Sequence, residues 1–236
     1  MTPLGAGLDH RVYAVGDALV ARFGEGTSTE APLLAAIAPL LPLPVPVPIA
    51  IDAEAGCLVL PRVPGTPLLD VPRAGRRAYA AQLLAFADAL HGLNPGVEVR
   101  ADDLAPEEWL DEAQRTWVVV RSEVPVSRRE AIEVVLGGAA PAPPTRRVLI
   151  HGDLGVEHVL VDAGRITGVI DWGDAVIGDP ALDLGRLMRD LGPIAGGGAR
   201  ARFYAVCTAL EDLAFGLEAG RDCYRTNALA ALEELA

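Results

Sequence analysis

The chain has 236 residues, of which 51% are hydrophobic and 22% charged, so it can bury a sizeable core as one large domain or two small lobes. Acidic residues outnumber basic ones by 32 to 20 and no basic tract stands out, which argues against nucleic acid as a partner. The sequence contains no lysine, which excludes chemistry that needs a lysine amine.

The first third of the chain predicts a small β-rich lobe. Residues 12–23 form an apolar pattern around Gly16 and Asp17, which indicates two short strands joined by a turn. Residues 57–60 have the composition of another strand, and residues 30–41 between these strands have a helical pattern.

A proline-rich stretch follows the predicted helix. Prolines alternate with apolar residues over 42–48, which is typical of an extended connector, and we expect it to pack against the core. The segment 61–67 is dense in proline and glycine and indicates a hinge. We therefore predict two lobes, 1–63 and 64–236.

The second lobe is predicted to be mostly helical. A helical stripe of Tyr79, Leu83, Phe86 and Leu90 lies within the predicted helix 73–93. Further helices are expected at 109–120, at 127–136 and from residue 180 onward.

Targeting and redox chemistry can also be judged from the sequence. Cys57, Cys207 and Cys223 are too widely spaced for a zinc motif and too few for a disulfide framework. The start of the chain lacks a secretory signal, and prolines interrupt the longest apolar stretch, 33–51. We expect a cytoplasmic protein that makes no use of a membrane.

A β-hairpin is predicted in the segment 151–184. The apolar runs 158–162 and 165–170 flank a two-residue turn at Ala163-Gly164. If Asp162 pairs with Arg165, His158 lies opposite Val169. One face of the hairpin then carries His158, Leu160, Val169 and Asp171.

This hairpin brings metal-ligating side chains together. His158 and Asp171 would be diagonal neighbours about 7–8 Å apart, a separation at which two side chains can hold one metal ion. Asp153, five residues before His158, can face the same metal from the loop that enters the hairpin. Each residue alone is more often a turn cap or a core residue, but their convergence favours a site for phosphoryl transfer.

These motifs resemble those of the aminoglycoside phosphotransferase family. The sequence HGDLGVEH, 151–158, is similar to the HxDxxxxN loop of the family, and IDWGD, 170–174, resembles its metal-binding motif. Gly178-Asp179-Pro180 with Asp183-Leu184 matches the stretch that follows. The resemblance covers nearly the whole chain and implies an α+β, bilobal, protein-kinase-like fold with a β-rich N-lobe and a mostly helical C-lobe that carries a catalytic β-hairpin.

The resemblance implies roles for the residues of these motifs. Asp153 would be the catalytic base, His158 and Asp171 would bind Mg²⁺, and His151 and Asp183 would support the catalytic loop. Most of the family has Asn at the position of His158. The histidine is expected in the 2''-aminoglycoside and macrolide phosphotransferases, and it is a softer Mg²⁺ ligand than an amide oxygen.

The nucleotide side carries a second departure from the family. The segment 3–10 is similar to the family's nucleotide loop and places Gly5 and Gly7 near the phosphates. Arg22 stands where the family has a phosphate-binding lysine, and Glu30 would be its ion-pair partner. The walls around the nucleotide base would be formed by Pro61, Val63, Leu160 and Ile170.

The acceptor side is less well marked by the sequence. Candidate acceptor-binding residues are Asp174, Asp190 and Glu211, all in or near the helical lobe. A less polar pocket, suited to a macrolide, would instead use aromatic residues, although such residues usually pack in the core. These aromatic residues are Phe203, Tyr204, Phe215 and Tyr224.

Together these features predict a Mg²⁺-dependent enzyme that moves the γ-phosphoryl group of ATP or GTP to a hydroxyl of an aminoglycoside or macrolide-like acceptor. Its partners would be the nucleotide and the acceptor, and the sequence leaves monomer or dimer open. Three alternatives remain. One is a kinase of an endogenous sugar, amine or amino-alcohol, another is a non-catalytic nucleotide-binding pseudokinase, which Arg22 would suit, and the weakest is a plain helical adaptor.

Overall fold

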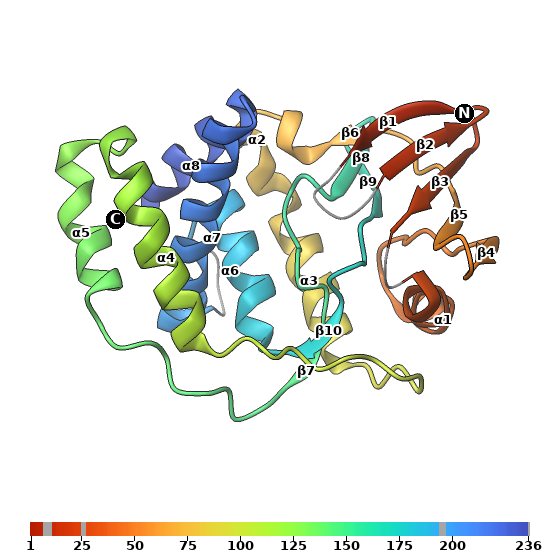
Figure 1. Cartoon of the computed structure of the whole chain (residues 1–236), viewed down its shortest axis with the longest axis horizontal. Coiled ribbons are helices and arrows are strands. Elements are labelled where there is room, and N and C mark those ends of the chain that lie inside the picture. Colours follow the sequence, from red (N-terminus) through yellow and green to blue (C-terminus); the bar gives the residue numbers. More distant parts are fainter. Residues whose placement is uncertain (7–10, 25–26, 194–196, 236) are drawn as a thin grey trace.

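The computed structural model describes residues 1–6, 11–24, 27–193 and 197–235. It consists of a β-rich part at the N-terminal end and a larger helical part at the C-terminal end (Figure 1). Two small sheets lie where these parts meet. The prediction of an α+β architecture with a β-rich first lobe and a helical second lobe is confirmed, whereas the exact boundary at residue 63 stays a prediction.

The N-terminal sheet has five antiparallel strands in the order β1-β2-β3-β5-β4. Its β2–β3 turn contains Gly16 at φ +62°, a conformation that glycine adopts without strain. The predicted strands are confirmed, while β1 and β4 were not predicted. The strands are β1 (Thr2–Ala6), β2 (Arg11–Val15), β3 (Leu19–Phe23), β4 (Ala50–Asp52) and β5 (Cys57–Pro61).

One helix, α1 (Thr27–Ile37), lies between β3 and β4, and a 3₁₀ turn at Ala38–Leu40 extends it. The proline-rich connector follows and packs as expected, because its apolar side chains contact the core. The amide of Val169 donates to the carbonyl of Pro44 over 2.9 Å. The connector therefore ties the end of α1 to the hairpin of the second lobe.

The helical part contains the remaining helices, and the predicted helix 73–93 is interrupted. Its first turn is a separate short helix, and a 3₁₀ turn at Arg77–Tyr79 divides it from the rest. The buried Arg76 of this first turn donates to the carbonyls of Leu69 and Val71 at 2.8 Å each. The predicted stripe holds, with Leu83, Phe86 and Leu90 fully buried. The helices are α2 (Arg73–Arg76), α3 (Ala80–Gly92), α4 (Pro106–Val120), α5 (Val126–Leu136), α6 (Pro180–Leu191), α7 (Gly198–Glu218) and α8 (Asp222–Leu235), with 3₁₀ turns at Leu68–Asp70, Arg77–Tyr79 and Arg121–Glu123.

The predicted hairpin forms, but its register differs from the prediction. Asp162 pairs with Arg165 as expected, yet a bulge at Thr167 shifts the ladder, so Val159 rather than His158 lies opposite Val169. Val169 is fully buried and does not share the face of His158. The small sheets contain β7 (Val148–Ile150) with β10 (Val176–Gly178), and β6 (Thr66–Pro67) with β8 (Val159–Asp162) and β9 (Arg165–Val169).

Two apolar clusters stabilise the fold. One is enclosed by α4 to α8. The other joins α1, α3, β8 and β9, and in it the ring of Trp172 lies 6.2 Å from that of Phe86. Trp172 belongs to the loop after β9, so this second cluster anchors that loop and packs α1 against the second lobe.

None of the described helices is both long and apolar enough to cross a bilayer. Cys57 and Cys207 are buried free thiols, and Cys223 is an exposed one.

Replacing Leu34 by Ala should lower the free energy of unfolding by about 2–5 kcal/mol, because this fully buried side chain fills the cluster that joins α1 to the second lobe. Leu40, 57% exposed in the adjoining 3₁₀ turn, provides the matched control, and Leu40→Ala should change stability by less than about 1 kcal/mol. Urea unfolding of both variants measures the difference. Equal losses would contradict the placement of α1 against this core.

Candidate active site

The loop 151–158 joins β7 to β8, and side chains of α6 accept hydrogen bonds from its backbone. Asp183 of α6 is fully buried, and its carboxylate accepts the backbone N–H groups of His151 and Gly152 at 3.0 Å each. The same carboxylate contacts Nε2 of His91 at 2.9 Å. The structure thus places Asp183 where the sequence expected a support for the catalytic loop.

Asp190, two turns further along α6, holds the other end of this loop. Its Oδ2 accepts the N–H of Val156 at 3.0 Å, and its other partners are Arg189 and Asn227. Asp190 is fully buried. The prediction that it contacts the acceptor is therefore wrong, because a paired interior carboxylate cannot reach a ligand.

His151 and Gly152 set the path of the loop. Nδ1 of His151 accepts the N–H of Asp153 at 3.3 Å, so Nε2 carries the proton and donates to the carbonyl of Ile170 at 3.1 Å. Complete burial lowers the pKa of His151 and keeps the ring neutral. Gly152 has φ +83°, and a Cβ there would overlap the carbonyl oxygen of Asp174.

Asp153 lies between two cationic groups. Its Oδ2 contacts Nε2 of His158 at 3.0 Å, and its Oδ1 is 2.9 Å from the guanidinium of Arg186. Burial alone raises the pKa of Asp153, but the charge of Arg186 and the hydrogen bond from His158 outweigh it and hold the pKa well below its usual value. Asp153 is therefore an ionised acceptor of hydrogen bonds.

His158 also faces the loop after β9, although the bulge has changed the predicted register. Asp171 has φ +62°, and this turn directs its carboxylate to within 3.9 Å of Nδ1 of His158. Burial lowers the pKa of His158, but Asp153 and the other nearby carboxylates raise it to about 9.

A divalent cation fits between His158 and Asp171. When Nε2 of His158 donates to Asp153, the neutral ring has a lone pair on Nδ1, the atom that faces the carboxylate of Asp171. Binding would displace the second imidazole proton. Potential ligand atoms of Asp153, Glu157 and His158 also lie within 4.8 Å of one another.

A cavity of about 460 Å³ opens beside Asp171, between the N-terminal sheet and the hairpin. Most of the side chains predicted to bind nucleotide line it, namely Arg22, Glu30, Pro61, Val63, Leu160 and Ile170. Gly5 lies in β1, where the sequence had predicted a loop, and Gly7 lies outside the described residues. The cavity is therefore assembled from both parts of the molecule.

Arg22 reaches the polar end of this cavity. It is buried, forms an ion pair with Glu30 of α1, and lies 3.2 Å from Asp171. Burial lowers its pKa and the charge of Asp171 partly restores it. The predicted pair of Arg22 and Glu30 is present, and it links β3 and α1 to the loop after β9.

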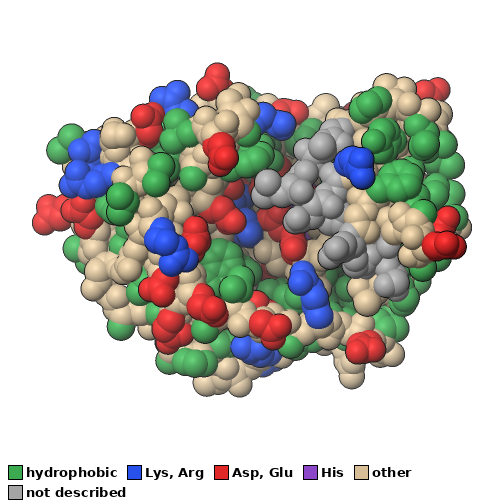
Figure 2. Space-filling model, in the orientation of Figure 1, with side chains coloured by type: hydrophobic (Ala, Val, Ile, Leu, Met, Phe, Trp, Pro, Cys, Tyr) green, Lys and Arg blue, Asp and Glu red, His purple; other side chains and the backbone are tan. Residues whose placement is uncertain are grey.

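The expected acceptor-binding residues are separated in the structure. Asp174 is exposed and 3.5 Å from Arg100, and Glu211 of α7 is exposed and 3.7 Å from Arg186. Phe203 and Tyr204 are core residues, whereas Phe215 and Tyr224 are half-buried and contact each other edge to face. Acidic side chains are numerous on the helical part of the face in Figure 2. Asp174 and Glu211 thus stay candidates for acceptor contacts.

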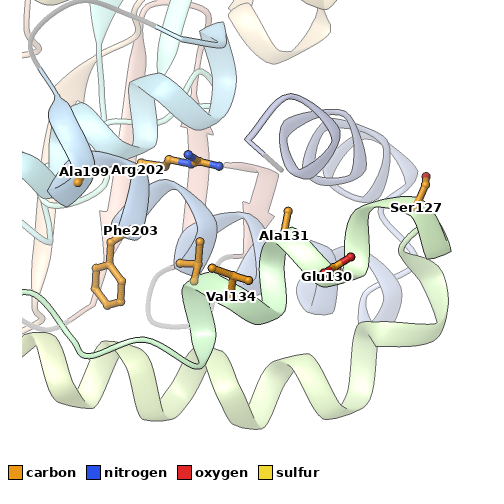
Figure 3. A pocket seen from close by; sticks show the side chains of 8 residues that line it. Ser127, Glu130, Ala131, Val134, Ala199, Arg202 and Phe203 are labelled. Carbon is orange, nitrogen blue, oxygen red and sulfur yellow. The ribbon is translucent and has the colours of Figure 1, made fainter.

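A second hollow, of about 590 Å³, lies between α5 and α7 (Figure 3). Its lining is mostly apolar, with Glu130 and Arg202 among its polar side chains. None of the catalytic-loop residues lines it, so the hollow belongs to the outer surface of the helix bundle.

Arg186, Arg189 and Glu157 were not predicted as parts of the site. Arg189 is fully buried and pairs with Glu157 at 3.1 Å, Asp190 at 2.8 Å and Asp212 at 2.9 Å. The spacing of Asp183, Arg186 and Asp190 on α6, at i, i+3 and i+7, places them on one face. This polar stripe within a helix was the signal that could have identified Arg186.

Comparisons with known proteins identify relatives of this chain. The viomycin phosphotransferase of Streptomyces vinaceus is 38% identical over 146 residues, which cover 56% of this chain and 49% of that protein. The matched segment thus spans about half of that relative.

Solved structures of similar fold align with nearly the whole chain. The GDP and kanamycin complex of APH(2'')-IIIa aligns with a TM-score of 0.68 and 22% identity over 99% of this chain and 91% of that one. The macrolide 2'-phosphotransferase MphH from Brachybacterium faecium has a TM-score of 0.55 and 28% identity over 98% and 91%. These matches confirm the predicted kinase-like fold. The pattern of the phosphotransferase enzyme family (APH) matches residues 1–222, and the chain belongs to this family.

Proposed function

We propose that the protein transfers the γ-phosphoryl group of a nucleoside triphosphate to a hydroxyl group of an antibiotic-like small molecule. The observation that carries this proposal is the placement of His158 between Asp153, at 3.0 Å, and Asp171, at 3.9 Å, with Asp171 lining the cavity between the two parts of the molecule. Phosphoryl transfer needs an oriented acceptor and compensated phosphate charge, and these groups can supply both.

Asp153 would orient the acceptor. Its ionised carboxylate accepts a hydrogen bond from the acceptor hydroxyl and points the oxygen lone pair at the γ-phosphorus. A new P–O bond forms to this oxygen while the bond from the γ-phosphorus to the nucleoside diphosphate breaks. Because the pKa of Asp153 is low, the carboxylate acts chiefly by orientation and receives the hydroxyl proton as the new bond forms.

His158 and Asp171 would hold Mg²⁺ through Nδ1 and a carboxylate oxygen. The bound cation would neutralise charge on the phosphate oxygens. Arg22 would supply a further positive charge to the phosphates in place of the usual lysine, since a guanidinium can bind two phosphate oxygens at once. The apolar walls of the cavity, which include Leu160 and Ile170, would enclose the nucleotide base.

The nature of the acceptor is supported by charge and by similarity. The chain carries a net charge of -12, which favours cationic ligands. One relative is named as a phosphotransferase of viomycin, and a structure of the same fold contains kanamycin. An endogenous amine, sugar or amino-alcohol has related chemistry, so the experiment below includes both classes.

Asp153→Asn should strongly slow transfer while nucleotide binding is retained. Mass spectrometry of antibiotics and common metabolites, incubated with the protein, Mg²⁺ and ATP or GTP, should reveal one acceptor that gains a phosphoryl group. The variant should lower kcat on the order of 10²- to 10⁴-fold, because an amide is a much weaker acceptor for the hydroxyl proton. A protein that binds nucleotide and phosphorylates nothing would instead support the pseudokinase.

Arg22→Met should raise the KM for nucleotide about 10- to 100-fold, since it removes charge-assisted hydrogen bonds to phosphate. Arg22→Lys keeps the charge and should stay within about fivefold of the unchanged protein. Steady-state kinetics at saturating acceptor measures both, and thermal unfolding checks that Glu30 tolerates each change. An unaltered KM in Arg22→Met would remove Arg22 from the phosphate site.

His158→Ala should raise the Mg²⁺ concentration for half-maximal rate by about 10-fold or more, because a metal ligand is lost. His158→Asn replaces the imidazole nitrogen by a harder amide oxygen and should lower the ratio of the Mn²⁺-supported rate to the Mg²⁺-supported rate. Metal titrations of chelator-treated protein provide the comparison. Identical titration curves for all three proteins would place the metal elsewhere.

A further inference from the structure

Arg186 contacts the catalytic loop in a way that none of the roles above explains. Its Nε donates to the carbonyl of Gly152 over 3.1 Å, and another guanidinium nitrogen lies 2.9 Å from Oδ1 of Asp153. The third nitrogen is 3.7 Å from Glu211 of α7. The guanidinium of Arg186 therefore contacts both the backbone of the loop and the carboxylate of Asp153.

These contacts of Arg186 limit the orientation of the Asp153 carboxylate. Oδ1 is buried against Arg186, while Oδ2 contacts His158 at 3.0 Å. The carboxyl plane is consequently fixed on both sides. Oδ2 has a second lone pair besides the one that faces His158, and this lone pair can accept an incoming hydroxyl. A lysine amine could not bind the Gly152 carbonyl and the carboxylate with the same fixed geometry.

Arg186 differs in this respect from its neighbour Arg189. Arg189 is fully buried and compensates the buried carboxylates of Asp190 and Asp212 as well as the partly buried Glu157, as a residue required for folding does. The side chain of Arg186 keeps 11% of its surface exposed, and its partners are the catalytic loop and Glu211, whose side chain is 59% exposed. The contacts of Arg186 are directed at the site rather than at the core.

We propose that Arg186 is a positioning residue for phosphoryl transfer, which fixes Asp153 with Oδ2 toward the acceptor hydroxyl, and that Glu211 holds the guanidinium in place. This inference rests on the proposed function. It also gives Glu211 a role through Arg186, in place of the direct contact with the acceptor expected from the sequence.

The test compares Arg186→Met, Arg186→Lys and Glu211→Gln with the unchanged protein, using the acceptor found by mass spectrometry. Arg186→Met should lower kcat about 100-fold and leave the KM for nucleotide within about twofold of its value in the unchanged protein. The reason is that a misplaced Asp153 carboxylate impairs the orientation of the acceptor hydroxyl but not the binding of the nucleotide. Arg186→Lys should have an intermediate kcat. Glu211→Gln should lower kcat about threefold, as expected for a partner in an exposed ion pair.

The ion pair of Arg128 and Glu233, 3.8 Å apart and remote from the loop, provides matched controls. Arg128→Met and Glu233→Gln should leave kcat unchanged. Thermal unfolding separates loss of fold from loss of orientation, and if Arg186→Met does not fold, Arg186→Lys and Glu211→Gln decide. The positioning role would be overturned if the variants of Arg186 and Glu211 had the kcat of the unchanged protein. It would also be overturned if the KM for nucleotide of these variants rose by the same factor by which their kcat fell. An unchanged protein that transfers no phosphate would overturn the proposed function, and the positioning role with it.

Discussion

The burial of charged side chains along one face of α6 is the constraint on which the site depends. A charged group can be removed from water only when partners replace its hydration, and the partners available here are the amides and side chains of the loop 151–158. Asp183 holds the start of the loop and Asp190 holds its end. The helix and the loop therefore fix each other, and Asp153 is presented from a rigid base.

A series of side chains with alternating charges extends from α7, through Asp153, to the N-terminal part of the molecule. Each member except the two ends lies between groups of opposite charge, so the repulsion between the carboxylates of Asp153 and Asp171 is offset by His158 and the flanking arginines. The series links α7 to α1 past the cavity between the N-terminal sheet and the hairpin. In order it consists of Glu211, Arg186, Asp153, His158, Asp171, Arg22 and Glu30.

Local patterns in the sequence were sufficient for much of the fold. Features that depend on residues near one another in the chain were predicted. They are the strands β2 and β3, the buried stripe of α3, and the hairpin turn between Asp162 and Arg165. The bulge at Thr167 depends on packing across the hairpin, and the sequence did not reveal it. His158 and Asp171 still meet, because the positive φ of Asp171 redirects the chain after the strand.

The amino-acid sequence was enough to single out the residues that could do chemistry. The spacing of Asp153, His158 and Asp171, together with the hairpin turn, was enough to predict a phosphoryl-transfer site. The partners that surround these residues followed from the folded arrangement, because burial and ion pairing depend on residues distant in the chain. This arrangement placed Asp190 in the interior, where it cannot meet an acceptor, and it brought Arg186 from α6 to the carboxylate of Asp153. Side chains acquire such partners only when helix and loop pack together.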